Sequence, residues 1–240
     1  VSHMDEPIAD SSLVPTWRLM EAITDTGIKC VLSGDGADES LAGYPTYMAH
    51  RLARLSTPVR PLLTRAAAAL PTRFDGVTPD YMARRFMDGL GRSWARRHQV
   101  WMGAWLPEEL QQLDPRIWEI VDEHAAAAHL ADDIGRAMYL DQRLYLRDGV
   151  LVKVDRASMA HGVEVRSPFL DHSIVELCAS MSTAIKSRYG VSKRVLRHAT
   201  RDLLPKDISN RKKKGFGAPT GPWLRDSCRH LLDGLDAALA

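Results

Sequence analysis

Apolar positions along this chain recur with the spacing of helices more often than with that of strands. The stretch from about Val14 to Thr24 has helical spacing, and a second helix is expected from about Asp38. Between them, Lys29 to Leu32 predicts a short buried strand. From Asp132 to His161 the pattern predicts one long helix, or two helices broken at Asp148-Gly149. We therefore expect an α/β protein that is predominantly helical and has few strands.

Tryptophans give one segment a stripe of large apolar side chains. Trp94, Trp101 and Trp105 are spaced by seven and then four residues, which places all three indoles on one face of a predicted helix. We interpret this stripe as core packing, with a ligand cage as the less favoured alternative.

Prolines mark where regular structure ends. The stretch from Thr57 to Asp80 contains four of them and is predicted to be a linker-like or variable region. Pro168 disfavours helix for the residue before it, so Glu164 to Asp171 should form an extended corner. A further helix is expected from Ser192, its cap, to about Leu203, and Pro205 ends it.

Composition narrows the class of protein. The chain has 240 residues and 45% hydrophobic content, enough for one globular unit. Its net charge of +2 and pI of about 8.5 are too mild to indicate a nucleic-acid partner. Only Arg211 to Lys214 is densely basic, and such a run is more often a solvated loop.

The cysteines and the apolar runs indicate the compartment. Cys30, Cys178 and Cys228 are too few and too far apart for a disulfide framework or a zinc site, which suits a reducing cytoplasm. No apolar run approaches the ~20 residues that span a bilayer, so we expect no membrane partner.

The strongest chemical signal is the segment Val-Leu-Ser-Gly-Asp-Gly-Ala-Asp-Glu at Val31 to Glu39. Its small residues let backbone N–H groups approach an anion, and the helix that follows directs its positive end toward it. Its three acids cannot bind phosphate themselves, so they imply a bridging Mg²⁺ or a catalytic role. An ordinary surface turn is the alternative, because Gly and Asp are common in loops.

Two further regions supply charge. Residues 153–171 mix opposite charges with apolar residues, which predicts a buried or cleft-lining element. A basic amphipathic helix begins at Gly190 to Arg197, and the basic loop Arg211 to Gly217 follows it. The basic helix and the basic loop both place cations where an acidic ligand could meet them.

These motifs together resemble, in order and along nearly the whole chain, the synthetase domain of the glutamine-hydrolysing asparagine synthetases. The matching segments are Asp5 to Pro7, Ser33 to Glu39 with Gly43-Tyr44, Lys153 to His161, Glu164 to Asp171, Lys193 to Arg197 and Arg211 to Gly217. The resemblance implies a fragment of an adenine nucleotide alpha hydrolase-like (ATP pyrophosphatase) domain.

Two parts of that family are not found in this sequence, namely a Ser-Gly-Gly-x-Asp-Ser loop that grips pyrophosphate and an N-terminal glutaminase domain. We expect residues 1–4, Val-Ser-His-Met, to be a cloning remnant. Residues 5–240 would then be the C-terminal part of the synthetase domain, inactive alone. The resemblance gives the missing glutaminase domain as a partner and leaves open a homodimer.

The resemblance also implies the reaction. The side-chain carboxylate of aspartate attacks the α-phosphorus of ATP, and glutamine-derived ammonia then displaces AMP to give asparagine. Because the first step joins two anions, it needs Mg²⁺ and a fixed cation. By match to the family's motifs, the implied roles are catalysis for Asp35 and Lys193, nucleotide contact for Ser33, Gly34 and Lys213, and Mg²⁺ binding for Asp38.

Each of these residues also has a structural interpretation. Lys193 could be an exposed helix lysine, Asp35 could make the turn, and Asp38 could cap the next helix. The charged residues Asp155, Glu164 and Arg166 are interpreted as buried ion pairs that hold the corner at Pro168. His161, within a family motif, is expected to be packed or capping.

Small departures from the family pattern leave the acids in place but affect the expected substrate. Ala37, Ser40, Leu41 and Ala42 differ from the residues that are frequent there. Related synthetases close β-lactam rings or amidate antibiotic and polysaccharide precursors, so another carboxylate is an alternative substrate. A noncatalytic binding module is the alternative from another class.

Overall fold

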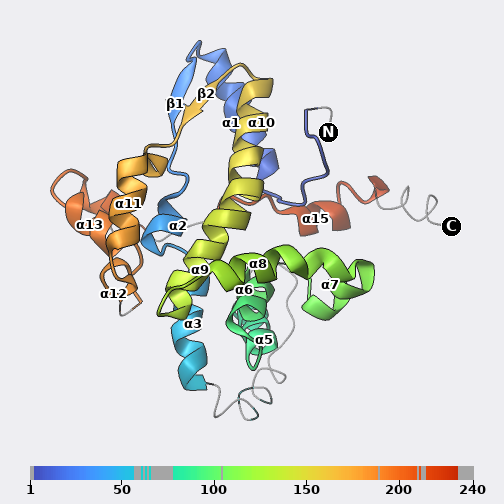
Figure 1. Cartoon of the computed structure of the whole chain (residues 1–240). Coiled ribbons are helices and arrows are strands. Elements are labelled where there is room, and N and C mark those ends of the chain that lie inside the picture. Colours follow the sequence, from blue (N-terminus) through green and yellow to red (C-terminus); the bar gives the residue numbers. More distant parts are fainter. Residues whose placement is uncertain are drawn as a thin grey trace.

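The computed structural model describes residues 3–56, 61, 63, 65, 78–103, 105–188, 190–209, 211 and 215–231. Helices dominate these residues, and their one sheet has two short parallel strands, which confirms the prediction of a mostly helical α/β chain. Figure 1 shows the strands at one end of a long central helical run and a block of helices at the other end. For the described residues, no helix is long and apolar enough to cross a membrane.

Helix α1 (Leu13–Asp25) and the strands β1 (Cys30–Leu32) and β2 (Glu164–Arg166) form the first end. The helix and β1 match the predicted elements closely. The strands pair in parallel, with Val31 opposite Val165. Both valines pack on the cluster of Met20, Ala157 and Val163, which joins α1, the sheet and α10 (Val152–Ala160).

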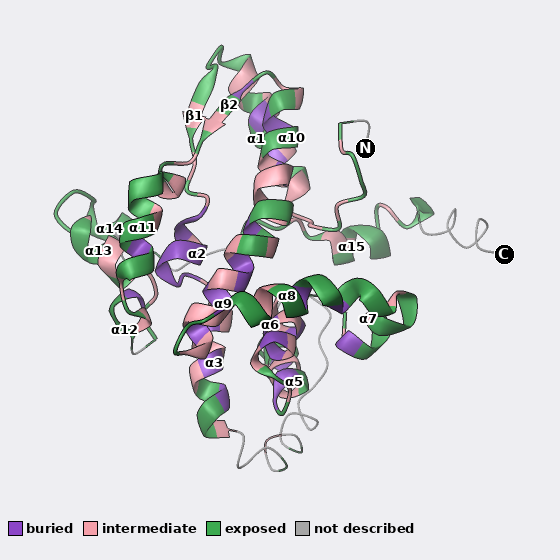
Figure 2. Ribbon diagram, viewed as in Figure 1, coloured by how far each residue is buried: buried purple, intermediate pink, exposed green. Residues whose placement is uncertain are grey.

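The prediction that Lys29 to Leu32 is a buried strand is wrong about burial. Cys30 is exposed and Leu32 is 76% exposed. Figure 2 shows no buried segment in either strand. Side chains alternate between the two faces of a strand, so only Val31 points toward α1 and α10. The opposite face carries Cys30 and Leu32, and no described helix covers it.

The long central run is continuous from α9 (Asp133–Asp141) through the π-helical segment η3 (Gln142–Leu151) into α10. The structure therefore selects the single long helix and shows no break at Asp148-Gly149. One Gly lowers helix stability by only about 1 kcal/mol, which packing along the run can offset. Asp132 caps the run by accepting hydrogen bonds from the N–H groups of Ile134 and Gly135.

The helical block at the other end packs on α9 through two apolar clusters, one around Tyr47 and one around Trp118. Its elements are α3 (Pro45–Ser56), α5 (Pro79–Gly89), α6 (Trp94–Met102), α7 (Pro107–Leu113), η2 (Pro115–Trp118) and α8 (Glu119–Ala127). Most of the linker-like region predicted at 57–80 lies outside the described residues; its end, Thr78 to Asp80, caps and begins α5.

The prediction that three indoles share one helix face is wrong for Trp105. Helix α6 ends at Met102, and Gly103 turns the backbone to an extended conformation. Trp94 packs beside the Trp118 cluster, and Trp101 stacks on Phe86, so these two indoles do serve packing. Trp105 lies beyond the helix end and is 59% exposed.

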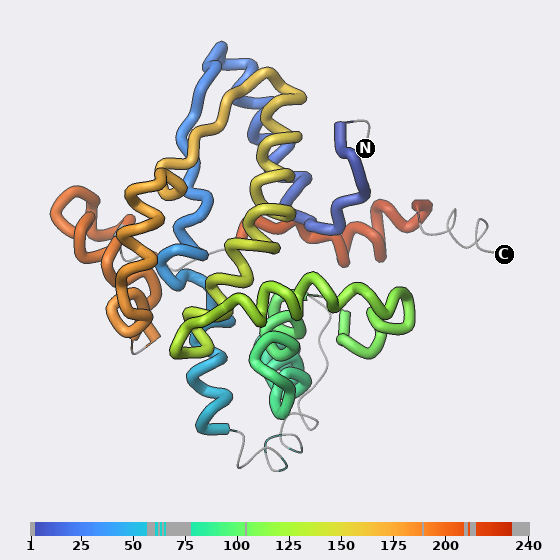
Figure 3. Tube along the Cα trace, in the orientation of Figure 1, coloured from blue at the N-terminus to red at the C-terminus, as the bar shows by residue number. Residues whose placement is uncertain are grey.

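The C-terminal third contains short helices. They are η4 (Pro168–Leu170), α11 (His172–Ser180), α12 (Thr183–Lys186), α13 (Arg194–Ala199), α14 (Lys206–Ser209) and α15 (Thr220–Arg225). The expected corner at 164–171 is therefore a strand followed by one tight turn. Figure 3 shows the chain before α15 returning to the N-terminal segment, where the N–H of Ala218 donates to the carbonyl of Ser11 at 3.4 Å.

The helix predicted from Ser192 to about Leu203 is shorter than expected. It begins at Arg194, ends at Ala199, and has Lys193 rather than Ser192 at its cap position, with no side-chain capping bond. Lys193 adopts a left-handed conformation with φ of 52°. That conformation is disfavoured for a non-glycine residue. The side chain of Lys193 contacts Asp38 in the short helix α2 (Ala37–Leu41).

Candidate functional site

The acid-rich turn lies where the two parallel strands end. The backbone N–H of Ser33 donates to the carbonyl of Arg166 at 2.8 Å, which continues the ladder by one residue. The Ser33 hydroxyl donates to Asp35 at 2.8 Å and lies 3.0 Å from the hydroxyl of Ser167. Ligand sites of parallel sheets form at this carboxyl edge. Sequence reasoning gave Ser167 no role, because only the pairing of β1 with β2 brings it to Ser33.

Two glycines give the turn its shape. Gly36 has φ of 82°, and a Cβ there would lie 2.1 Å from Cδ2 of Leu170, so a side chain would clash. Gly34 is exposed, and a Cβ there would meet no atom within 4 Å. The turn is thus fixed at Gly36 and open at Gly34, which leaves the backbone of Gly34 accessible to an approaching ligand.

Asp38 and Lys193 meet although they lie far apart in the sequence. The Lys193 amine is 3.1 Å from Oδ1 of Asp38, and the two side chains are 24% and 23% exposed. Gly43 makes room for this pair, since a Cβ there would lie 1.8 Å from Oδ1 of Asp38 and 2.5 Å from Cε of Lys193. The structure therefore brings together two of the predicted site residues. Asp35 contacts Ser33 instead.

Side-chain charge dominates the electrostatics of this turn. Helix α2, which follows the turn, has only five residues, so its dipole adds less than that of a helix of ordinary length. Among the described residues, no group of three or more His, Cys, Asp or Glu side chains could hold a metal ion.

The third acid of the motif, Glu39, has a different environment. It is 1% exposed and accepts a 2.6 Å hydrogen bond from the hydroxyl of Tyr44. Burial raises the pKa of Glu39, and the hydrogen bond from Tyr44 opposes that rise only in part. The amide of Gln142 donates to the Glu39 carbonyl at 3.3 Å. Glu39 therefore anchors α2 to the central run and is not available to a ligand.

Lys153 is a buried residue to which the sequence assigned no role. It is 6% exposed, and its amine donates to Asp10 at 2.6 Å and to the hydroxyl of Ser12 at 2.5 Å. Burial raises the pKa of Asp10, but the hydrogen bonds from Lys153 and Ser12, together with the charge of Lys153, outweigh burial and lower that pKa. Arg156 pairs with Asp5 in the same segment. These contacts hold residues 5–12 along α10.

The prediction of buried ion pairs at the corner is wrong. Glu164 and Arg166 do pair, but their side chains are 54% and 69% exposed, and Asp155 is exposed. Residues two apart on a strand share a face. Glu164 pairs with Cys30 and Arg166 with Leu32, so all four side chains lie on the same, uncovered face of the sheet. The segment 153–171 is accordingly buried only along one side.

Two other predicted residues have different outcomes. Lys213 lies outside the described residues, so the structure does not place it. His161 packs edge-on against Trp17 with ring centroids 4.7 Å apart and occupies the C-cap of α10, which confirms the packed or capping role.

A buried polar chain within the helical block was not predicted. Tyr47 donates to Asp141 at 2.6 Å, Asp141 lies 2.8 Å from Nε2 of His98, and Nδ1 of His98 lies 3.2 Å from Nε2 of His50. Arg97 approaches Nδ1 of His50 at 3.4 Å. Because arginine only donates and a carboxylate only accepts, every bond is satisfied when both histidines are neutral. Burial, then the charges of His98 and Arg97, lower the pKa of His50 to about 2.

Comparison with known proteins extends these observations. A family model described as asparagine synthase matches residues 1–239. The chain is 25% identical to asparagine synthetase (glutamine-hydrolyzing) 1 of Bacillus subtilis and 31% identical to a putative asparagine synthetase of Mycobacterium tuberculosis, each over 94% of this chain. It spans 36% and 35% of those proteins. A protein named amidase chry2 from Gibberella zeae is 23% identical over 92% of the chain and 36% of its own length.

Proposed function

The chain belongs to the asparagine synthase family, and from this premise we propose that it forms part of an ATP-dependent amidotransferase-type synthetase. The proposed enzyme adenylates the side-chain carboxylate of aspartate and transfers glutamine-derived ammonia to it, giving asparagine, AMP and pyrophosphate. The proposed fold is the adenine nucleotide alpha hydrolase-like domain, completed by segments from the rest of the protein. A glutaminase domain, a cytoplasmic location and a homodimer also stay predictions.

The observation that carries this proposal is the meeting of Asp38 and Lys193 beside the turn at Ser33 to Asp35. A lysine that is only 24% exposed has lost much of its hydration and would gain from a phosphate group placed beside it. The left-handed conformation of Lys193 supports a functional role, because disfavoured backbone states cluster at such sites.

The proposed roles follow from this arrangement. Lys193 neutralises charge on the reacting phosphate, so that an anionic carboxylate can approach it. The open backbone of Gly34 and the hydroxyl of Ser33 contact the nucleotide. Asp35, which accepts a hydrogen bond from Ser33 at the strand ends, lies beside the acyl group. It acts in the step that forms the adenylate and in the step in which ammonia consumes it. Lys213 is proposed to reach the pyrophosphate.

Magnesium fits the residues present as an ion shared with the substrate. Mg²⁺ is usually held by one or two carboxylates together with substrate phosphates, and Asp38 with Asp35 supplies that number. When bound, the ion would neutralise phosphate charge and orient the leaving pyrophosphate. The pairing of Asp38 with Lys193 keeps this carboxylate in place before the ion arrives.

The test is adenylate formation in a protein that joins this chain to the parts present in its relatives. Exchange of labelled pyrophosphate into ATP should require aspartate. Replacing the cation, Lys193→Met, should lower the exchange rate by a factor on the order of 10² to 10³. The exposed lysine of Lys29→Met is the matched control and should leave the rate unchanged.

Two results would contradict the proposal. One is full exchange activity in the Lys193→Met protein. The other is the absence of exchange with any carboxylic acid, together with no stabilisation of the protein by Mg²⁺ and ATP, which would favour the noncatalytic binding module.

A different carboxylate substrate is the second candidate. It is supported by the relatives with amidase names, among them amidase chyE of Penicillium rubens, which is 24% identical over 93% of this chain. The same exchange assay with a panel of carboxylic acids separates the two candidates, because only the true substrate should promote exchange at low concentration.

A further inference from the structure

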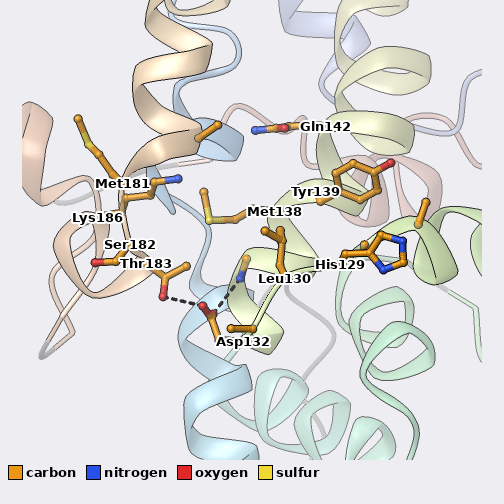
Figure 4. A pocket seen from close by; sticks show the side chains of 15 residues that line it. His129, Leu130, Asp132, Met138, Tyr139, Gln142, Met181, Ser182, Thr183 and Lys186 are labelled. Carbon is orange, nitrogen blue, oxygen red and sulfur yellow. Dashed lines mark hydrogen bonds between the residues drawn. The ribbon is translucent and has the colours of Figure 1, made fainter.

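A hollow lies away from the strand ends, between the loop before α9, the central run and the turn from α11 to α12. Its volume is about 570 Å³, within the range of small-molecule sites. Figure 4 shows Leu130, Met138 and Met181 on its walls. The apolar character of these side chains, together with lining alanines, would favour an apolar ligand body.

Lys186, the last residue of α12, brings a cation to this hollow. It is 6% exposed, and burial lowers its pKa. Three cationic side chains are buried among the described residues. Lys153 is paired with Asp10, and Arg97 with Asp133 at 2.8 Å. Within the same described ranges, the Lys186 amine makes no hydrogen bond or ion pair.

The charge of the nearby Asp132 raises the pKa of Lys186, but by less than burial lowers it. Asp132 also lines the hollow, but its carboxylate already accepts hydrogen bonds from two backbone N–H groups and from the hydroxyl of Thr183. Figure 4 shows the Lys186 amine directed into the hollow, with the Gln142 amide on the facing wall. The ammonium group has lost much of its hydration without gaining a hydrogen-bond acceptor among the described residues, so an acceptor on a bound ligand would stabilise it.

We propose that this hollow is a binding site for a small organic monoanion, a carboxylate on an apolar body, with Lys186 as its counter-ion. A carboxylate would supply the hydrogen-bond acceptor that the Lys186 amine lacks, whereas a phosphate dianion would bring two negative charges close to the carboxylate of Asp132. The methionines and Leu130 would enclose the apolar body. This site is separate from the Asp38 and Lys193 pair, and its ligand contacts do not depend on the reaction proposed above.

The site contacts the acid-rich turn indirectly. Gln142 lines the hollow and also donates to the carbonyl of Glu39, which belongs to the same short helix as Asp38. A ligand that moves Gln142 would therefore act on α2 from its buried side.

The test is isothermal titration of this chain with 3-phenylpropanoate, with 3-phenylpropanamide as the uncharged probe and inorganic phosphate as the dianionic one. We expect the carboxylate to bind at least about tenfold more tightly than either of the others. Lys186→Met should abolish that preference, and Lys29→Met should retain it. A tryptophan at the exposed rim, Ala179→Trp, should weaken binding by obstructing the hollow without altering the core.

Stability provides a readout that a merely structural lysine would not give. Replacing a mostly buried ammonium group that has no hydrogen-bond acceptor among the described residues should raise the melting temperature of Lys186→Met without ligand, whereas loss of a structural lysine would lower it. The proposal is overturned if the carboxylate does not bind, if phosphate or the amide binds as tightly, or if the Lys186→Met protein keeps the preference for the carboxylate.

Discussion

Lowering the pH should destabilise this chain through His50, at the centre of the buried polar chain. The pKa of His50 is about 2 in the folded protein, because of burial and the neighbouring His98 and Arg97, against an ordinary value of 6.5. Between these two values the unfolded chain binds a proton that the folded chain excludes. The stability is therefore complete above pH 6.5 and is lost as the pH falls below it.

The magnitude follows from the width of that interval. Each pH unit below the unfolded pKa removes about 1.4 kcal/mol from the free energy of unfolding. Going from about pH 7.5 to about pH 5 should thus remove about 2 kcal/mol through His50 alone. A proton added at Nδ1 of His50 would also face the guanidinium of Arg97, which has no lone pair to accept it.

Urea denaturation followed by circular dichroism at several pH values measures this loss. The glutamine in His50→Gln cannot take up a proton, but it can still accept a hydrogen bond from Arg97 and donate one to His98. Between about pH 7.5 and about pH 5, the free energy of unfolding of this variant should therefore fall by about 2 kcal/mol less than that of the unaltered chain. His198→Gln, at an exposed position, is the matched control and should follow the unaltered chain. Identical pH dependence for His50→Gln and the unaltered chain would refute the reasoning.

Two further predictions concern stability measured by the same denaturation. Gly36→Ala should lower the free energy of unfolding by about 1–3 kcal/mol, because Gly36 has a positive φ and a Cβ there would clash with Leu170. The control Gly34→Ala should change it by less than about 0.5 kcal/mol. Equal effects of the two substitutions would contradict the geometry of the turn. Lys153→Met should lower the free energy of unfolding by about 1–3 kcal/mol and speed proteolysis within residues 5–12, because Asp10 loses its cation. An unchanged rate of proteolysis would show that this contact does not hold the segment.

The sequence alone determined the elements whose signals are local. Helix α1, strand β1 and the start of α2 lie close to their predicted positions, because spacing at three, four or two residues depends only on neighbours along the chain. The acid-rich turn could be found for the same reason, since its small residues and carboxylates are consecutive. The family resemblance assigned Asp38 and the distant Lys193 to one site, which no local pattern could do, and the structure added that the two side chains pair.

Tertiary structure alone decided which surfaces are covered. The uncovered face of β1 and β2, the exposure of Trp105 and the continuity of the helix through Asp148-Gly149 all depend on what packs beside each segment. The buried hydrogen-bond network that links Tyr47, Asp141, His98 and His50 also had no sequence signal. Nor did the burial of Lys186, whose amine has no hydrogen-bond partner among the residues that the structure describes. A polar residue carries the same letter whether water or protein surrounds it, and only packing determines whether its charge must find a partner.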